Sequence, residues 1–284
     1  MNDVIINANC LDGMRKMAEE SVDAIITSPP YGMQRVKQYG GHKEEEYVKW
    51  FHPIACEMLR VLSPRGSLIL NIKGNYTHGH RTLYVYKLVI DMVEHCGWRY
   101  VDDIIWYKTS APPVGDKKCT LRDAWEHCFH FAKSDTIDFH KNAIAIPAGD
   151  WAKRLLDNKS YQRKIQSYKT ATGSGFEAAC YRHFTKHQLE MVYPDNVLMG
   201  PPDQTKHLHP ATFPIWLPDW FIRLFTVQGQ TVLDPFAGSG TTLVAAKSLG
   251  RHYAGFDLDP SYCQIAQKRL DSTIYEPQFA EVVE

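Results

Sequence analysis

The chain has 284 residues, enough for one large α/β domain with an insertion or for two smaller domains. Its 32 basic and 32 acidic side chains cancel, so binding to a polyanion would depend on a local concentration of positive charge. The seven cysteines include no Cys-x-x-Cys pair, and no run approaches the roughly 18 apolar residues of a membrane span. These features favour a cytoplasmic enzyme and argue against a disulfide framework, a zinc site or a membrane protein.

The amino-terminal part of the chain has the pattern of a β-α-β unit. Apolar runs at 4–6 and 22–26 predict strands, and apolar residues recur at helical spacing between 11 and 17. The polar segment 34–46 contains Gly40-Gly41 and a charge run. It predicts either a loop that covers a neighbouring site or a merely solvated loop.

The alternation of helices and strands continues through the next 70 residues. Apolar spacing predicts a helix over 50–62 that ends at Pro64 and Gly66, followed by a strand at 67–72. A further helix and two further strands are predicted at 84–96, 103–107 and 126–131. Strands separated by helices imply a mainly parallel sheet.

The stretch Thr27-Ser28-Pro29-Pro30-Tyr31-Gly32 stands at the end of the second predicted strand. The first proline has no N–H for a sheet and favours an extended Ser28 backbone, so the hydroxyl and the next carbonyls project from the strand's carboxyl end. Ligands of open α/β sheets bind at that edge. An ordinary strand-ending turn with an aromatic lid would have the same local pattern.

The segment 151–190 is locally basic and aromatic. It contains eight Lys or Arg and three acids, with six aromatic residues between them. Such interleaving suits phosphate contacts and base stacking, although a solvated helical face has the same composition.

Two histidine pairs are candidate metal ligands. His207 and His209 precede an amphipathic helix around 220–225, and His78 and His80 form the other pair. Neither pair has nearby acidic or thiol partners, so the sequence predicts no metal site.

A second motif lies near the carboxyl end of the chain. A strand at 231–236 leads through the glycine-rich turn 237–240 into a helix at 241–249, and the next strand ends at Asp257. Glycines let a ligand approach the backbone, the helix amino terminus attracts an anion, and the acid can accept from ribose hydroxyls. The pattern predicts NAD or S-adenosylmethionine. The turn lacks the G-x-G-x-x-G form, which favours the latter.

Together, Thr27-Ser-Pro-Pro-Tyr-Gly32 and Asp234-Pro-Phe-Ala-Gly-Ser-Gly-Thr-Thr242 resemble the β-class, circularly permuted DNA amino-methyltransferases. The resemblance implies a Rossmann-like, mainly parallel sheet with helices on both faces, plus an inserted target-recognition region. It divides the chain into a catalytic half at 1–133, a target-recognition, DNA-binding region at 134–204 and a cofactor-binding half at 205–284.

The resemblance also implies the residues of the site. Asn9 stands where the family usually has an aspartate that accepts from the adenine amino group, and an amide oxygen can accept as well. The S-adenosylmethionine site would comprise Asn9, Thr212, Phe213, Asp234, Phe236, Gly238, Gly240, Thr241, Asp257 and Leu258. The catalytic segment would be Ser28, Pro29, Pro30 and Tyr31, and the DNA contacts Lys153, Arg154, Arg163 and Lys164.

The implied reaction methylates an exocyclic amine of a base flipped out of double-stranded DNA. Family members that act on cytosine N4 mostly have serine at the position of Ser28, and those that act on adenine N6 mostly have Asp or Asn. The sequence therefore favours cytosine N4, with adenine N6 as the alternative. A methyltransferase for small molecules or proteins and a catalytically silent DNA-binding module are further alternatives. The resemblance implies a restriction-modification system with a cognate restriction endonuclease, and leaves monomer or homodimer open.

Overall fold

The computed structural model describes residues 2–32, 43–77, 80–110, 121–147, 149, 191–203 and 213–275. It divides into two compact units, Met1–His140 with Asn196–Glu284, and Lys141–Asp195. Most of the predicted loop 34–46, the whole basic segment 151–190, and His78, His207, His209 and Thr212 lie outside the described residues. In the described part of the chain, no helix has the length and apolar character needed to cross a membrane.

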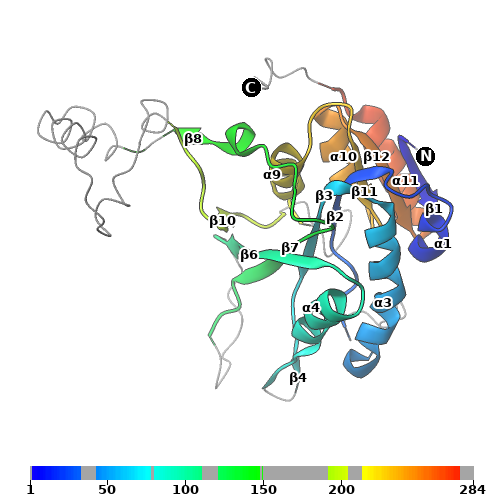
Figure 1. The fold of residues 1–284 in the computed structure, drawn as a ribbon. Helices are drawn as coiled ribbons and strands as arrows, with labels where there is room; N and C mark the ends of the chain where they lie inside the picture. Colours follow the sequence, from blue (N-terminus) through cyan, green and yellow to red (C-terminus); the bar gives the residue numbers. More distant parts are fainter. Residues whose placement is uncertain are drawn as a thin grey trace, which may run out of the picture. The chain divides into compact units, whose positions relative to one another are not determined.

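A mainly parallel sheet lies at the centre of the first unit (Figure 1). Its eight described strands are, in chain order, β1 (Val4–Asn7), β2 (Val22–Thr27), β3 (Leu62–Ile72), β6 (Arg99–Lys108), β7 (Trp125–Ala132), β10 (Val197–Gly200), β11 (Thr231–Asp234) and β12 (His252–Asp257). Their spatial order is β1-β12-β11-β2-β3-β7-β6-β10. All neighbours are parallel except β7, which is antiparallel to both β3 and β6.

Helices cover both faces of this sheet. On one face, α3 (Glu44–Val61) packs against α1 (Cys10–Met14) and α4 (Tyr84–Glu94). On the other, α10 (Thr241–Ser248) packs against α9 (Trp216–Phe225) and α11 (Pro260–Ser272). The apolar runs of the central strands are buried between the layers, as strands covered on both faces require. The predicted Rossmann-like, mainly parallel sheet with helices on both faces is confirmed.

The permuted order of the elements is visible at one edge of the sheet. The first strand, β1, pairs in parallel with β12, the last, from Val4 opposite Ala254 to Asn7 opposite Asp257. A strand from the amino-terminal end of the chain therefore completes the half of the sheet formed by its carboxyl-terminal end.

The boundaries around α3 differ from those predicted. The helix begins at Glu44, so the last residues of the predicted loop 34–46 are helical, and it ends at Val61, before Pro64. Strand pairing starts at Leu62 and is irregular before Ser67. A Cβ on Gly66 would lie 2.8 Å from the Asp23 carbonyl oxygen, so this glycine lets the irregular segment pass close to β2.

Short elements complete the described structure. A hairpin of β4 (Tyr76–Thr77) and β5 (His80–Arg81) belongs to the first unit. The second unit contains a 3-10 turn η1 (Lys141–Ile144) and the antiparallel pair β8 (Ile146–Pro147) and β9 (Met191–Val192). Within it, the Tyr193 hydroxyl donates to Asn142 Oδ1 at 2.9 Å.

Candidate active site

The two sequence motifs meet at the carboxyl edge of two adjacent strands. Strands β2 and β11 pair in parallel, with Ala24 opposite Val232 and Ile25 opposite Leu233. From β11 the chain passes through α10 to β12 on one side, and from β2 through α3 to β3 on the other. This reversal of direction is a topological switch point, where open α/β sheets bind their ligands.

Asp234 links the two motifs, which are far apart along the chain. Its carboxylate accepts from the Thr27 hydroxyl at 2.6 Å, the Thr242 hydroxyl at 2.7 Å and the Phe236 N–H at 3.1 Å. Burial raises the pKa of this carboxyl group to about 6, although the hydrogen bonds oppose the rise. Asp234, predicted to border the methionine half of a cofactor, thus has its carboxylate directed at protein donors and fixes β11, β2 and α10 to one another.

The glycine turn between β11 and α10 adopts a conformation that suits glycine. Gly238 and Gly240 have φ angles of 50° and 80°. A Cβ on Gly240 would lie 2.7 Å from the Ala266 Cβ, so α11 also requires a glycine there. No side chain caps the amino terminus of α10, which begins at Thr241 and leaves backbone N–H groups for an anionic ligand.

An arginine on α11 forms hydrogen bonds to the same glycine turn. Arg269 Nη1 donates to the Ser239 carbonyl at 2.7 Å and to the hydroxyls of Ser239 and Thr241 at 3.1 Å each. Thr241, predicted to border the cofactor, is only 6% exposed. Arg269 was absent from the sequence prediction because nothing in the spacing of α11 indicates which face contacts the turn.

Asp257 lies at the end of β12, beside the glycine turn. Its carboxylate accepts from Gly238 N–H at 2.9 Å and from Asp259 N–H at 2.8 Å. Burial raises the pKa of this group. Each carboxylate oxygen has a second lone pair, so Asp257 can still accept from two ribose hydroxyls.

The predicted adenine-side residues come from the neighbouring ends of β1 and β12. Asn7 Nδ2 donates to the carbonyls of Asp257 and Leu258 at 3.0 Å, which ties the two strand ends together. The Leu258 side chain is exposed and offers an apolar surface. Asn9 Oδ1 accepts from the Leu11 N–H at 2.9 Å as the cap of α1, so its amide oxygen already has one partner.

Two tyrosines fix the backbone of the Ser28 motif. The Tyr47 hydroxyl on α3 donates to the Pro30 carbonyl at 2.8 Å. The Tyr84 hydroxyl on α4 accepts from the Gly32 N–H at 3.2 Å and donates to the Lys73 carbonyl at 2.8 Å. Neither tyrosine was predicted as part of the site. Both tyrosines reach the motif only because α3 packs on α4, and no sequence pattern indicates that packing.

Tyr31 is oriented through its hydroxyl group. It donates to Glu126 Oε2 at 3.0 Å, and Lys108 Nζ forms an ion pair with the other Glu126 oxygen. Burial and the negative charge of Glu126 raise the Tyr31 pKa, while hydrogen bonding to Ser28 opposes the rise. Glu126 was missed, although an acid in the apolar run of β7 is itself a signal.

Beyond Tyr31, charged side chains lie along the carboxyl edge of the sheet. Asp123 pairs with Lys73, after β3, and with Arg81, each at 2.9 Å. Lys108, the last residue of β6, and Glu126, near the start of the antiparallel β7, belong to the same edge. The glycine-turn residues thus occupy one half of the edge and charged groups the other, with Ser28 between them.

Aromatic packing connects the two halves. Phe236, just after β11, lies with its ring centroid 5.9 Å from that of Trp50 and 6.2 Å from that of Phe51 on α3. The same helix carries Tyr47. Phe236, which was predicted to border the cofactor, therefore adjoins the helix that holds the Ser28 motif. Phe213 lies outside any helix or strand and is partly buried.

Comparison with known proteins decides the family. A family model described as DNA methylase matches residues 22–268, which include both motifs. The chain belongs to this DNA methylase family. The resemblance found in the two motifs is thereby confirmed.

Individual relatives agree with this assignment. The methylase is 28% identical to the type II methyltransferase M.PvuII of Proteus hauseri over 96% of this chain and 85% of that protein. It is 25% identical to the type II methyltransferase M.HpaI of Haemophilus parainfluenzae over 96% and 75%.

Solved structures agree on the fold. PvuII DNA methyltransferase, described as cytosine-N4-specific, superposes with a TM-score of 0.71 at 24% identity over 95% of this chain and 86% of that one. A putative DNA modification methylase of Thermus thermophilus, solved with S-adenosyl-L-methionine, gives 0.63 at 21% identity over 97% and 95%. The class I methyltransferase fold is confirmed.

The methyl donor of this DNA methylase is S-adenosylmethionine, as predicted. The residues present fit it. The uncapped amino terminus of α10 suits the methionine carboxylate, and the partly buried Asp257 carboxylate suits the ribose. The role of each predicted site residue remains a prediction.

Replacing Asp257 by alanine is expected to weaken S-adenosylmethionine binding by about 1.5 to 3 kcal/mol, the range for lost hydrogen bonds to a charged group. Isothermal titration calorimetry measures this directly. Asp12→Ala, which removes an exposed acid on α1, should bind as the wild type does. Unchanged affinity in a folded Asp257→Ala protein would contradict the assignment.

Proposed function

We propose that this methylase transfers a methyl group from S-adenosylmethionine to the N4 amine of a cytosine flipped out of double-stranded DNA. The observation that carries the proposal is the position of the Ser28 hydroxyl and the Pro29 carbonyl. They follow β2 directly, at the switch point beside β11 and its glycine turn. The two acceptors thus adjoin the half of the edge assigned to the cofactor.

The chemistry explains why two acceptors are needed. The lone pair of an exocyclic amine is delocalised into the base ring, so the nitrogen is a poor nucleophile. Acceptors directed at its two hydrogens favour a tetrahedral nitrogen and stabilise the positive charge that develops during attack. The bound cofactor supplies an electrophilic methyl group on a sulfonium. The protein's part is to orient and polarise the amine.

The hydrogen bonds of the segment support Pro29 as the second acceptor. Tyr47 occupies the Pro30 carbonyl. Among donors that the structure describes, none uses the Pro29 carbonyl. Ser28 is partly exposed, while Tyr31 is held by Glu126 at the side of the same segment, where its ring can stack on a base.

Cytosine N4 is favoured over adenine N6 on two grounds. Ser28 occupies the position where adenine-specific relatives mostly have Asp or Asn. The PvuII methyltransferase, to which this chain is similar, is described as cytosine-N4-specific. Adenine N6 is the second candidate, because both amines present the same two hydrogens.

Nucleoside analysis of the methylated DNA identifies the methylated base. DNA methylated by the purified enzyme is digested and its nucleosides are separated by mass spectrometry. We expect N4-methyldeoxycytidine. N6-methyldeoxyadenosine alone would replace cytosine by adenine and leave the transfer mechanism intact, whereas neither product with intact cofactor binding would point to a DNA-binding module.

We further propose that residues 134–204 form the target-recognition region, with 151–190 as its main duplex contact. Neutralising Lys153, Arg154, Arg163 and Lys164 together should weaken DNA binding and flatten its salt dependence, because fewer counterions are released. Cofactor affinity should stay the same. The matched control neutralises four exposed basic residues elsewhere in the chain, namely Arg15, Lys16, Lys87 and Lys268. An equal salt slope for both quadruple variants would place the contact outside 151–190.

The restriction-modification role is a proposal of the same kind. M.PvuII and M.HpaI, to which this chain is similar, are type II methyltransferases. The corresponding partner would be a restriction endonuclease that cleaves the same sequence when it is unmethylated. Methylated plasmid that resists one endonuclease of the source cell, while unmethylated plasmid is cut, would support it.

A further inference from the structure

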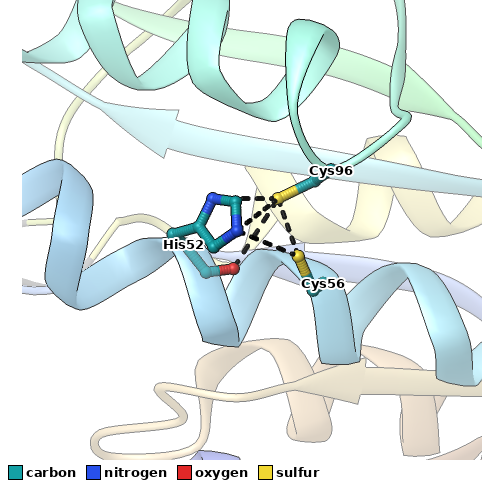
Figure 2. Close-up of side chains that lie close together, drawn as sticks. All are labelled: His52, Cys56 and Cys96. Carbon is teal, nitrogen blue, oxygen red and sulfur yellow. Dashed lines mark hydrogen bonds between the residues drawn. The ribbon is translucent and has the colours of Figure 1, made fainter.

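Three potential metal ligands lie together on the helical layer formed by α3 and α4 (Figure 2). His52 and Cys56 are one turn apart on α3, and Cys96 follows the end of α4. Their ligand atoms all lie within 4.8 Å of one another. This His-Cys-Cys cluster has no part in the active site described above.

The packing of α3 against α4 brings the cluster together. At one end of the helix pair the rings of Tyr47 and Tyr84 lie 4.7 Å apart. Beyond the other end, Trp98 Nε1 donates to the Ala55 carbonyl at 3.1 Å, which fixes the turn that carries Cys96. Because Cys56 and Cys96 are 40 positions apart, the absence of a Cys-x-x-Cys pair did not reveal them.

One of the distances from His52 Nε2 matches a metal site. This nitrogen is 3.7 Å from Cys56 Sγ and 4.0 Å from Cys96 Sγ, and Cys96 Sγ lies closer to His52 Nδ1, at 3.4 Å, so the Cys96 side chain would have to turn towards Nε2 to share an ion with it. In a tetrahedral zinc site, with Zn–N and Zn–S bonds of about 2.0 and 2.3 Å, neighbouring ligand atoms lie about 3.5 to 3.8 Å apart. The two sulfurs, 2.8 Å apart and both in partly exposed residues, would need to separate by roughly 1 Å.

An acid behind the histidine orients it for this role. Asp91 Oδ2, on α4, lies 2.8 Å from His52 Nδ1. Since a carboxylate only accepts hydrogen bonds, the proton belongs on Nδ1, and Nε2 presents its lone pair. Carboxylate–histidine–metal arrangements fix metal-binding histidines in this way.

We propose that His52 Nε2, Cys56 Sγ and Cys96 Sγ bind one zinc ion, with a water molecule as the fourth ligand. Thiolate and imidazole ligands favour zinc over magnesium or calcium. Binding releases the two thiol protons to solvent as the two sulfur–metal bonds form. The metal competes with these protons for the sulfurs, so affinity should fall as the pH is lowered.

A bound metal ion would cross-link α3 to the turn that follows α4. The same two helices carry Tyr47 and Tyr84, which hold the Pro30 carbonyl and the Gly32 N–H. A metal ion at the other end of the pair would stabilise this support without contacting the reacting groups. The inference therefore stands whether or not the proposed base specificity is correct.

Titration of the reduced full-length protein with Co²⁺ under anaerobic conditions tests the site. We expect thiolate-to-cobalt charge-transfer absorption that saturates at one equivalent and is removed by Zn²⁺. Cys56→Ser and Cys96→Ser should each weaken binding at least 100-fold, and Asp91→Asn about 10- to 100-fold. His95→Gln, which changes an exposed histidine next to the cluster, is the matched control and should bind as the wild type does.

A second measurement covers variants that fold poorly. Zn²⁺ should raise the Tm of the wild type and of His95→Gln, and leave those of the two serine variants unchanged. Absence of the charge-transfer band in the wild type would overturn the proposal. So would a band unaffected by Cys56→Ser, or isolation of the chain with a Cys56–Cys96 disulfide and no metal binding after reduction.

Discussion

Replacing Ser28 by alanine should lower the rate of methyl transfer by about 10²-fold or more, with little change in cofactor affinity. In the proposed mechanism the hydroxyl accepts a hydrogen bond from the target amine, an interaction that strengthens as positive charge develops on the nitrogen. Loss of such a group affects the transition state more than the ground state. The substitution removes only one oxygen atom from a partly exposed position, so folding should be preserved.

Single-turnover methylation with saturating cofactor and DNA separates this effect from binding. Ser21→Ala is a suitable control, because the Ser21 hydroxyl donates to the Ala18 carbonyl at the surface before β2. An unchanged rate for Ser28→Ala, with normal cofactor binding, would remove the Ser28 hydroxyl from the mechanism. The Pro29 carbonyl would then be the remaining acceptor.

The order of elements and both motifs could be predicted because local patterns determine them. Buried strands such as β2 and β12 are largely apolar runs, and the two glycines at 237–240 indicate a turn. That the motifs meet could be inferred only from the resemblance to the family. Periodicity along the chain does not specify which strands are neighbours, and the pairing of β2 with β11 joins residues 208 positions apart.

The supporting contacts could not be predicted, because they join side chains distant in sequence. The Tyr31 hydroxyl meets Glu126 95 residues later, and Cys56 meets Cys96 only because α3 packs on α4. The extent of α3 was also misjudged. Residues 44–46 have the polar composition of a loop, but they form the first turn of a helix whose later turns carry buried apolar residues.

Asp234 is expected to matter for folding as much as for binding. Asp234→Ala should lower the free energy of unfolding by about 1 to 3 kcal/mol for each donor that it leaves without an acceptor, namely the Thr27 hydroxyl and the Phe236 N–H. Thr242 has a second acceptor in the Ile26 carbonyl at 3.4 Å. Urea denaturation of the protein without cofactor measures the change.

Asp234→Asn should instead preserve the fold and change its pH dependence. An asparagine oxygen can accept from Thr27 and Phe236, and its NH₂ group can donate to Thr242 once that hydroxyl turns to Ile26. In the wild type, burial raises the pKa of Asp234 from 3.8 to about 6. The folded protein therefore holds the proton more tightly than the unfolded chain does.

The sign of the effect follows from this difference in proton binding. Stability from the protonated carboxyl group is fully present below pH 3.8 and is lost as the pH rises towards 6, a decrease of about 3 kcal/mol. Asp234→Asn cannot titrate and should lack this decrease. Subtracting its unfolding free energies from those of the wild type between pH 4 and pH 7 isolates the contribution of Asp234 from those of other acids. Parallel curves for the two proteins would mean that Asp234 keeps an ordinary pKa in the folded state, and that its three hydrogen bonds fully offset its burial.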